Sequence, residues 1–369
     1  MRVLYILCCM FIILILCGLV YSYIKDCLPT NKNLKYIIFC SVAVISLISI
    51  YIIPNEVYDL FRHHQMIDDL RNGGYGLNTE YDNLFLIKGL FYLVALTGHS
   101  ELIQLVSCVI FYSVFAYILY DYYKCNTLKA RQFVTIVCVF FAMISYIDVY
   151  SQVRNPIAYA LFSLAIYRDF YRNKKTLVTV LLYISPLFIH YSLVLLVFIR
   201  IAYIFKDKWF RYRYIIISWS FLVPILIMVA EKTSIKYLVL MADQIKNYVF
   251  HYLGDIRLLI INYIFVLCLF VIVEYCLRKK LVNDKNLEVV RFLDVIIGVS
   301  LSCFAVPNIF TRMMYVFGMF LPIIFNLISE KILLKQKYNT IFNGCCLAYC
   351  IGMFSYQIVA FLNNGLMIL

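Results

Sequence analysis

The stretch PNEVYDLFRHHQMIDDLRNGGYGLNTEYD, residues 54–82, is the longest polar run in a chain that is otherwise almost entirely apolar. Over little more than a dozen positions it gathers seven charged or histidine side chains: Asp59, Arg62, His63, His64, Asp68, Asp69 and Arg71. Long apolar segments lie on both sides of it. The stretch therefore predicts a polar loop between membrane spans, and the placement of the spans decides which side of the membrane it faces.

A helix over residues 56–71 would divide these side chains between two faces. The 3.6-residue period predicts one mostly polar side, made of Asp59, Arg62, His63, Met66 and Asp69. It predicts an opposite apolar side, made of Leu60, Phe61, Ile67 and Leu70. A solvated amphipathic helix would explain the same pattern without any function.

Composition places the chain among membrane proteins. The hydrophobic fraction is 64% and the charged fraction only 14%, against about 25% charged residues in soluble domains, and the mean hydropathy is +0.87. We expect one all-α, polytopic transmembrane domain over residues 1–369. The net charge of +13 is spread over short clusters between apolar runs, which is typical of membrane topology signals and indicates no nucleic-acid partner.

Runs of roughly 20 apolar residues are the units that cross a bilayer. About twelve are predicted, near residues 3–24, 35–53, 101–120, 132–150, 154–170, 176–189, 191–205, 214–230, 258–277, 292–307, 313–329 and 339–362. The first lacks a cleavage site and is expected to be a span and not a signal peptide. Residues 84–98 form a shorter apolar segment with Lys88 inside it, which predicts a re-entrant or interfacial helix.

Charge asymmetry orients these spans. Six loops hold 22 of the 33 Lys and Arg residues and only 7 acidic ones: residues 25–35, 121–131, 168–175, 206–213, 278–291 and 330–338. Residues 54–83 hold two Arg and six acidic residues. The positive-inside rule predicts that the basic loops are cytoplasmic and that residues 54–83 face outward. Residues 231–255 form a second outward loop, and both termini are expected outside.

Three further polar side chains lie near the predicted outer ends of spans, close to the hydrocarbon region, where an unpaired charge costs several kcal/mol. Arg154 precedes Asn155-Pro156, His190 follows Pro186 in a turn between two short spans, and Arg312 follows Pro307. Each alone is explained by snorkelling, packing or pairing. Together they predict a cavity beneath the 54–83 loop that suits a diphosphate, because Arg offers bidentate donors to phosphate and helix N-termini attract anions.

The fourteen cysteines indicate no cofactor chemistry. Eleven lie within or at the edge of apolar segments, and no CxxC pair occurs. We interpret them as small packing residues and expect neither a disulfide framework nor a metal site.

The polar motifs also resemble those of the EpsG/Wzy-type polysaccharide polymerases, in the same order along the chain. The matching segments are DLFRHHQMIDDLR at 59–71, RNPIAYALFSLAIY at 154–167, FIHYSLVLL at 188–196 and TRMMYVFGMFLPII at 311–324. The resemblance covers roughly residues 50–330. Tyr191 departs from the family pattern, where a proline is frequent.

This resemblance implies a membrane-embedded lipid-phosphosugar glycosyltransferase in the bacterial cytoplasmic membrane. Its substrate would be undecaprenyl-diphosphate-linked oligosaccharide, which it would polymerise on the outer face into O-antigen, capsule or exopolysaccharide. A chain-length regulator and a flippase are the implied protein partners. No cofactor is implied.

The expected mechanism assigns roles to the polar residues. Arg154 and Arg312 would bind the donor diphosphate and compensate its charge as it leaves. His190, or Asp59 or Asp69 of the outer loop, would help to remove the proton of the acceptor hydroxyl. Arg62, His63 and Arg71 would contact phosphate or sugar.

Two other membrane functions fit part of the pattern. A lipid-linked oligosaccharide flippase would also need internal cations, but transporters usually contain two related halves, and the sequence shows no repeat. A membrane O-acyltransferase of surface glycans takes its donor from the cytoplasmic side, whereas the candidate residues here map outward. A purely structural membrane protein gives no reason for arginines at broken helix ends.

Overall fold

The structure of the protein, a computed structural model, describes residues 14, 16–53, 56, 59–73, 84–126, 128–203, 256–302, 307–331 and 336–363. Within these ranges the chain is helical and has no strand, which confirms the all-α class. The helices are α2 (Asn31–Ser49), α3 (Asp59–Arg71), α4 (Phe85–Thr97), α5 (Leu102–Cys125), α6 (Ala130–Met143), α7 (Tyr146–Ser151), α8 (Arg154–Ile166), η2 (Tyr167–Tyr171), α9 (Leu177–Ile184), η3 (Ser185–Phe188), α10 (Leu193–Ala202), α14 (Ile256–Arg278), α15 (Asp284–Ser302), α16 (Pro307–Met319), α17 (Leu321–Lys331) and α18 (Gln336–Asn363).

The chain divides into two compact units. Unit 1 is Met1–Leu193 with Gly318–Leu369, and unit 2 is Val194–Phe317. In unit 2, α14 and α15 pack against each other. The Tyr203 ring lies edge-on to Phe292, and its hydroxyl donates to the carbonyl of Glu288 (3.3 Å).

Apolar helices of membrane-crossing length are present among the described residues. Four qualify, namely Asn31–Ser49, Leu102–Cys125, Leu259–Arg278 and Ile341–Val359, with a fifth if the broken pair Asn308–Met319 and Leu321–Glu330 is one span. The protein is thus a membrane protein. The count of about twelve spans stays a prediction, and residues 214–230 and 231–255 lie outside the described ranges.

Several segments predicted as single spans are broken. Residues 132–150 form α6 and the short α7, separated at Ile144 and Ser145, and residues 313–329 are interrupted at Phe320. Residues 84–98 do form the short helix that was predicted, α4, which ends at Gly98 in the left-handed conformation (φ 77°). At 1.5 Å per residue α4 is about 20 Å long, too short for a hydrocarbon core of about 30 Å.

Helix α5 is the centre of unit 1 and packs against α2, α7, α8 and α17. Its residues Phe111 and Ile118 are fully buried. Toward α2, the buried Gln104 donates its side-chain amide to the carbonyls of Ser49 and Ile52. This amide satisfies carbonyl groups at the C-terminal end of α2, which have no partner within the helix.

Helices α5 and α8 run parallel. Ser107, near the start of α5, donates to the carbonyl of Val149 just before α8 (2.7 Å), and Asp121, near its end, accepts from the hydroxyl of Tyr167 just after α8 (2.7 Å). Because α8 rises about 1.5 Å per residue, its first residue Arg154 lies about 20 Å from Tyr167. Unit 1 therefore has two polar ends with an apolar layer between them.

The end near Tyr167 gathers four of the basic loops. Arg131 donates its backbone N–H to Asp26 (3.1 Å), Asn126 donates to the Tyr171 hydroxyl (2.9 Å), and Asn326 of α17 donates to α5. The four are loops 25–35, 121–131 and 168–175 and the start of loop 330–338, which the described end of α17 supplies. Their common position agrees with the charge pattern that assigns them to one side of the membrane.

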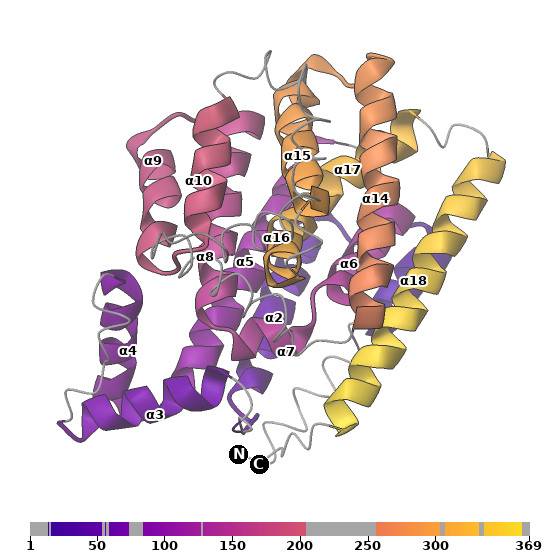
Figure 1. Ribbon diagram of the computed structural model, residues 1–369. Helices are drawn as coiled ribbons and strands as arrows, with labels where there is room; N and C mark the ends of the chain where they lie inside the picture. The colour runs from indigo at the N-terminus through magenta and orange to yellow at the C-terminus, as the bar shows by residue number, and fades with distance from the viewer. Residues whose placement is uncertain are drawn as a thin grey trace. The chain divides into compact units, whose positions relative to one another are not determined.

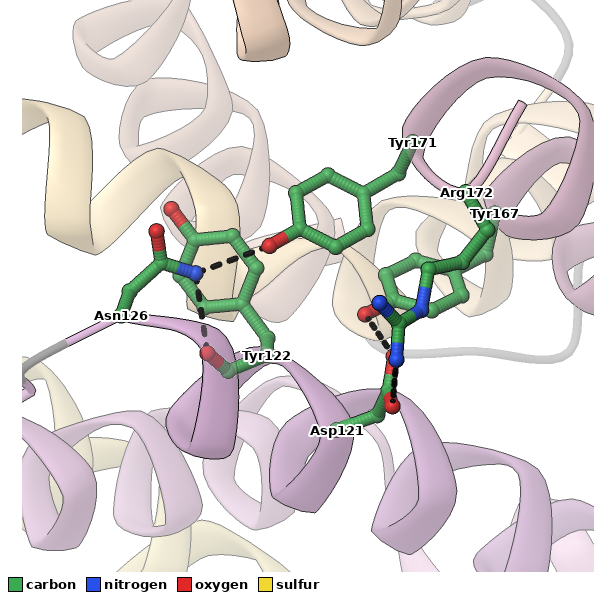
Figure 2. A network of polar contacts seen from close by, with 6 residues as sticks. All are labelled: Asp121, Tyr122, Asn126, Tyr167, Tyr171 and Arg172. Carbon is green, nitrogen blue, oxygen red and sulfur yellow. Dashed lines mark hydrogen bonds and ion pairs between the residues drawn. The ribbon is translucent and has the colours of Figure 1, made fainter.

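A network of polar contacts ties η2 to the end of α5, and Figure 2 shows its members: Asp121, Tyr122, Asn126, Tyr167, Tyr171 and Arg172. Asp121 accepts from Tyr167 and forms an ion pair with Arg172. Asn126 donates both to the carbonyl of Tyr122 (2.9 Å) and to Tyr171. The π-helical turn of η2 stacks the Tyr167 and Tyr171 rings, with centroids 4.8 Å apart. The network thereby fixes this end of α8.

Replacing Asp121 by alanine should destabilise unit 1. The change leaves the Arg172 guanidinium and the Tyr167 hydroxyl without their shared acceptor, and the free energy of unfolding should fall by about 2–3 kcal/mol. In detergent, the apparent melting temperature should drop by roughly 5 °C. Asp68→Ala, at an exposed carboxylate of α3, is the control and should change stability by less than about 0.5 kcal/mol. Equal melting temperatures for the two variants would contradict the assigned role.

Candidate functional site

Helix α3 is the described part of the polar 54–83 loop. It begins at Asp59, ends at Arg71 and is followed by Gly73 in the left-handed conformation (φ 77°). An acidic first turn and a basic last turn complement the helix dipole. It packs against α4 and α7, and Figure 1 shows it lying across one end of unit 1, with α4 rising beside it.

The predicted division of α3 into faces is wrong for two residues. Its buried side chains are Leu60, His63, Met66 and Ile67. His63 and Met66 thus lie with the apolar residues, because positions 60, 63 and 67 are spaced by three and four and share one face. Asp59, Arg62 and Asp69 are exposed, as their polarity predicts.

His63 is the most enclosed polar side chain of the loop. It is 0% exposed, and its ring lies 5.1 Å from that of Phe91 of α4, centroid to centroid. Neither ring nitrogen has a hydrogen-bond partner among the residues that the structure describes. A buried imidazole without partners is costly, since each unmade bond forfeits about 1–3 kcal/mol. This histidine therefore needs an explanation beyond packing.

The surroundings of His63 keep its ring neutral. Burial lowers the pKa of His63 well below its usual range, and the positive charges of Arg154 and Arg62 and the neighbouring His64 lower it further. Because the charge of Arg154 acts on His63, the start of α8 lies near the buried side of α3. Burial also lowers the pKa of His64, although Glu101 and Asp68 oppose that shift.

Arg154 is the first residue of α8, as predicted. The first-turn N–H groups are largely used: Asn155 donates to the carbonyl of Gln152 (2.9 Å), Ile157 donates to that of Val153 (3.4 Å), and Pro156 has no N–H. What this helix end offers an anion is consequently the guanidinium, and much less the free backbone donors that the sequence suggested.

A chain of side-chain hydrogen bonds connects the residues on either side of Arg154. Asn155 donates to the side chain of Gln152 (3.0 Å), which donates to the carboxylate of Asp148 on α7 (3.1 Å). The side-chain oxygen of Asn155 is buried and has no hydrogen-bond partner in the described part of the chain. The break between α7 and α8 is thus held by polar side chains on both sides of the arginine.

His190 lies in a turn that packs against the same helix. The turn follows η3, which contacts α8 and α4. Nδ1 of His190 accepts a hydrogen bond from the backbone N–H of Ser192 (3.1 Å) and lies 2.7 Å from the Ser192 hydroxyl. That hydroxyl is 3.1 Å from the hydroxyl of Tyr159 on α8. The three side chains form a continuous chain from α8 to the imidazole.

The other predicted residues of α3 are on its exposed side or at its end. Asp59 and Arg62 form an ion pair with each other (3.3 Å), with 47% and 44% of their side chains exposed. Arg71 donates to the carbonyl of Gly98 (3.1 Å) and so links the ends of α3 and α4. Asp69 is exposed.

Arg312 lies in unit 2, on the second turn of α16, which begins at Pro307. The sequence predicted Arg312 at a helix N-terminus, and this prediction is wrong because α16 begins five residues earlier. That it lies beside Arg154 stays a prediction.

Sequence reasoning missed five residues at this end of unit 1: Asp148, Gln152, Asn155, Tyr159 and Ser192. One signal was present, since Asp148 is the sole acidic residue between Ala130 and Arg154. Gln152 and Asn155 pair locally across the break between α7 and α8, whereas the pairing of Tyr159 with Ser192 depends on the approach of η3 to α8. Among the described residues, no group of three His, Cys, Asp or Glu side chains could hold a metal ion.

Comparison with known families identifies the chain. The model of the EpsG family matches residues 37–367, almost the full length. The chain belongs to the EpsG family. No curated protein and no solved structure matched it. In this EpsG family protein the match includes α3, the start of α8 and the His190 turn, so the residues that form the candidate site lie within the family region.

The buried His63 should make the stability of this EpsG family protein depend on pH. The unfolded chain binds a proton near pH 6.5, whereas the folded chain resists it, so stability is present above about pH 6.5 and is lost as the pH falls. The loss should reach roughly 1.4 kcal/mol per pH unit. Melting temperatures in detergent between about pH 8 and pH 5 measure this slope.

A phenylalanine at this position tests the assignment. His63→Phe keeps the contact with Phe91 and should reduce the acid-side loss of stability. His99→Phe, at an exposed histidine, is the matched control and should leave the loss unchanged. An equal slope in the wild type and in His63→Phe would contradict a neutral, buried imidazole.

Proposed function

We propose that this membrane protein polymerises undecaprenyl-diphosphate-linked oligosaccharide repeat units into a surface polysaccharide. The reaction would take place at the outer face of a bacterial cytoplasmic membrane that the chain crosses many times. Membership of the EpsG family supports a polysaccharide polymerase in general. The product would be O-antigen, capsule or exopolysaccharide, made together with a flippase and a chain-length regulator.

The observation that carries the proposal is the meeting of the loop helix and the broken helix. His63 of α3 is buried, and the charges of Arg154 and Arg62 act on it and lower its pKa further; η3, which precedes the His190 turn, packs on the same α8. Cations and neutral imidazoles with hydrogen-bonding capacity suit a ligand that carries phosphate and hydroxyl groups together. A lipid-linked diphosphate sugar is such a ligand.

The proposed location also follows from the two ends of unit 1. The basic loops gather near Tyr167, about 20 Å along α8 from Arg154. If the basic end is cytoplasmic, the Arg154 end reaches the outer leaflet, where translocated lipid-linked units are found. This inference joins the charge pattern to the observed separation along one helix.

The chemistry would be a single displacement at the donor sugar. A hydroxyl oxygen of the acceptor unit forms a bond to the anomeric carbon, and the bond from that carbon to the diphosphate oxygen breaks. The lipid diphosphate leaves with the electron pair, its charge compensated by Arg154 and Arg312. The hydroxyl proton passes to His190 or to a carboxylate of α3, Asp59 or Asp69.

The remaining loop residues would bind the substrate. Arg62, His63 and Arg71 would contact phosphate or sugar. The unpartnered ring nitrogens of His63 provide one donor and one acceptor for sugar hydroxyls, at no cost in charge. No metal or cofactor enters this scheme.

Arginine 154 provides the test of this function. In a host strain lacking the gene, complementation with Arg154→Ala should give single-repeat glycan in place of the ladder of chain lengths on a gel. The rate of polymerisation should fall by about 100-fold or more, the usual effect of removing a group that stabilises charge in the transition state. Arg131→Ala, at the opposite end of unit 1, should restore the ladder at equal protein level.

Other glycan patterns would support other functions. A normal ladder without the gene, but lacking acetyl groups, would identify an O-acyltransferase. Lipid-linked units retained inside the cell would identify the flippase. Either result overturns the polymerase proposal.

A further inference from the structure

The turn that carries His190 is rigid, and its rigidity determines what the imidazole can do. The carbonyl of Pro186 accepts from the N–H groups of Ile189 (3.0 Å) and His190 (2.9 Å). On the far side, Leu193 donates back to the carbonyl of His190 (3.3 Å). Backbone hydrogen bonds on both sides of the histidine therefore hold its Cα in place.

The hydrogen bond from Ser192 decides which nitrogen carries the proton. A backbone N–H has a fixed proton, and that of Ser192 points at Nδ1 of His190 from 3.1 Å. Nδ1 must therefore accept, so it bears no proton. In the neutral ring the proton then lies on Nε2, because each neutral imidazole has one donor and one acceptor nitrogen.

Tyr159 and the Ser192 hydroxyl reinforce this assignment. Tyr159 is 1% exposed, and its hydroxyl lies 3.1 Å from that of Ser192, which in turn lies 2.7 Å from Nδ1. With Nδ1 as an acceptor, the Ser192 hydroxyl donates to the ring and accepts from Tyr159. A proton on Nδ1 would face the fixed proton of the Ser192 backbone N–H, so the geometry favours the tautomer that carries its proton on Nε2.

We propose that Tyr159 and Ser192 are positioning residues that hold His190 as a neutral donor at Nε2, aimed at an oxygen of the leaving diphosphate. The proposal rests on the polymerase function above and narrows it. Nε2 already holds a proton and Nδ1 is capped, so His190 does not receive the proton of the acceptor hydroxyl. That proton passes to a carboxylate of α3, Asp59 or Asp69, and the diphosphate leaves with the electron pair of the broken bond.

This arrangement has a physical advantage beside Arg154. Tyr159 lies five residues after Arg154, about 7.5 Å along the axis of α8, so the chain through Ser192 anchors the imidazole near the first turns of that helix. A neutral donor adds hydrogen bonding to an oxygen as its negative charge grows, without repelling the arginine. An imidazolium there would be repelled by the guanidinium of Arg154, and little water would be present to screen the two positive charges.

Two substitutions of His190 separate a donor from a base. The side-chain amide of glutamine in His190→Gln places an N–H₂ near the position of Nε2 but takes up no proton. If His190 donates, His190→Gln should retain polymerisation within about tenfold of wild type, whereas His190→Ala should lose about 100-fold. If His190 is the base, both variants lose activity equally, and the proposal fails.

The positioning residues have their own prediction and control. Ser192→Ala and Tyr159→Phe should each slow polymerisation several-fold in the wild-type background and have no further effect when combined with His190→Ala. A further loss in the combined variants would show that they act independently of the histidine. Tyr191→Phe, at the half-exposed neighbouring tyrosine, should leave the ladder unchanged.

Nitrogen NMR of the purified protein tests the tautomer without any assay of function. With labelled histidine, and with the His190→Gln spectrum to assign the signal, Nε2 should be protonated and Nδ1 unprotonated from about pH 6 to about pH 8. A proton on Nδ1 would overturn the inference even if the protein is a polymerase. A protonated Nε2 in a protein whose deletion leaves the ladder intact would instead overturn the proposed function and leave the tautomer assignment standing.

Discussion

The break between α7 and α8 is the feature on which the candidate site of unit 1 depends. A helix interrupted within an apolar bundle leaves backbone groups that water does not reach, and each must find a partner within the protein. Ser107 supplies one by donating to the carbonyl of Val149, and the N–H of Asn155 bonds the carbonyl of Gln152. Pro156 has no backbone N–H, so one fewer donor needs a partner. With these backbone groups paired, Arg154 is held as the first residue of α8, where its side chain is partly exposed.

Unit 1 separates its two polar ends by chemical character. At one end Asp121 and Arg172 form an ion pair among stacked tyrosines, and each charged group has an opposite charge beside it. At the other end cationic Arg154 and Arg62 lie near a neutral His63. The first arrangement is a structural network in which the charges are paired. The second combines positive charge with unmet hydrogen-bonding capacity, which is what an anionic, hydroxyl-rich ligand requires.

Both histidines of the candidate site, His63 and His190, are assigned a neutral imidazole. Burial and two arginines lower the pKa of His63, whereas in the proposed arrangement the backbone N–H of Ser192 occupies Nδ1 of His190 and leaves the proton of the neutral ring on Nε2. Both mechanisms let imidazoles share a small region with arginines without mutual repulsion. They also leave the arginines as the permanent charges of the region, since a guanidinium does not titrate under physiological conditions.

The sequence by itself determined the class of the protein, the family and the positions of several helices, among them α4 and the start of α8. Apolar runs predicted helices, and Pro156 predicted a helix start at Arg154, because proline is suited to the first turn. The short segment at 84–98 predicted α4 correctly. These features are local, since they depend on composition and backbone chemistry within one segment.

Only the tertiary structure decided the partners of the polar side chains. His63 was predicted on a polar face, but it packs against Phe91 because α4 and α7 cover the face that Leu60 and Ile67 define. The pairing of Tyr159 with Ser192 arises where η3 meets α8, across more than thirty residues of chain. Helical spacing shows which side chains share a face, whereas the neighbouring helices determine which face is buried, and that is why the chemistry of this site had to wait for the structure.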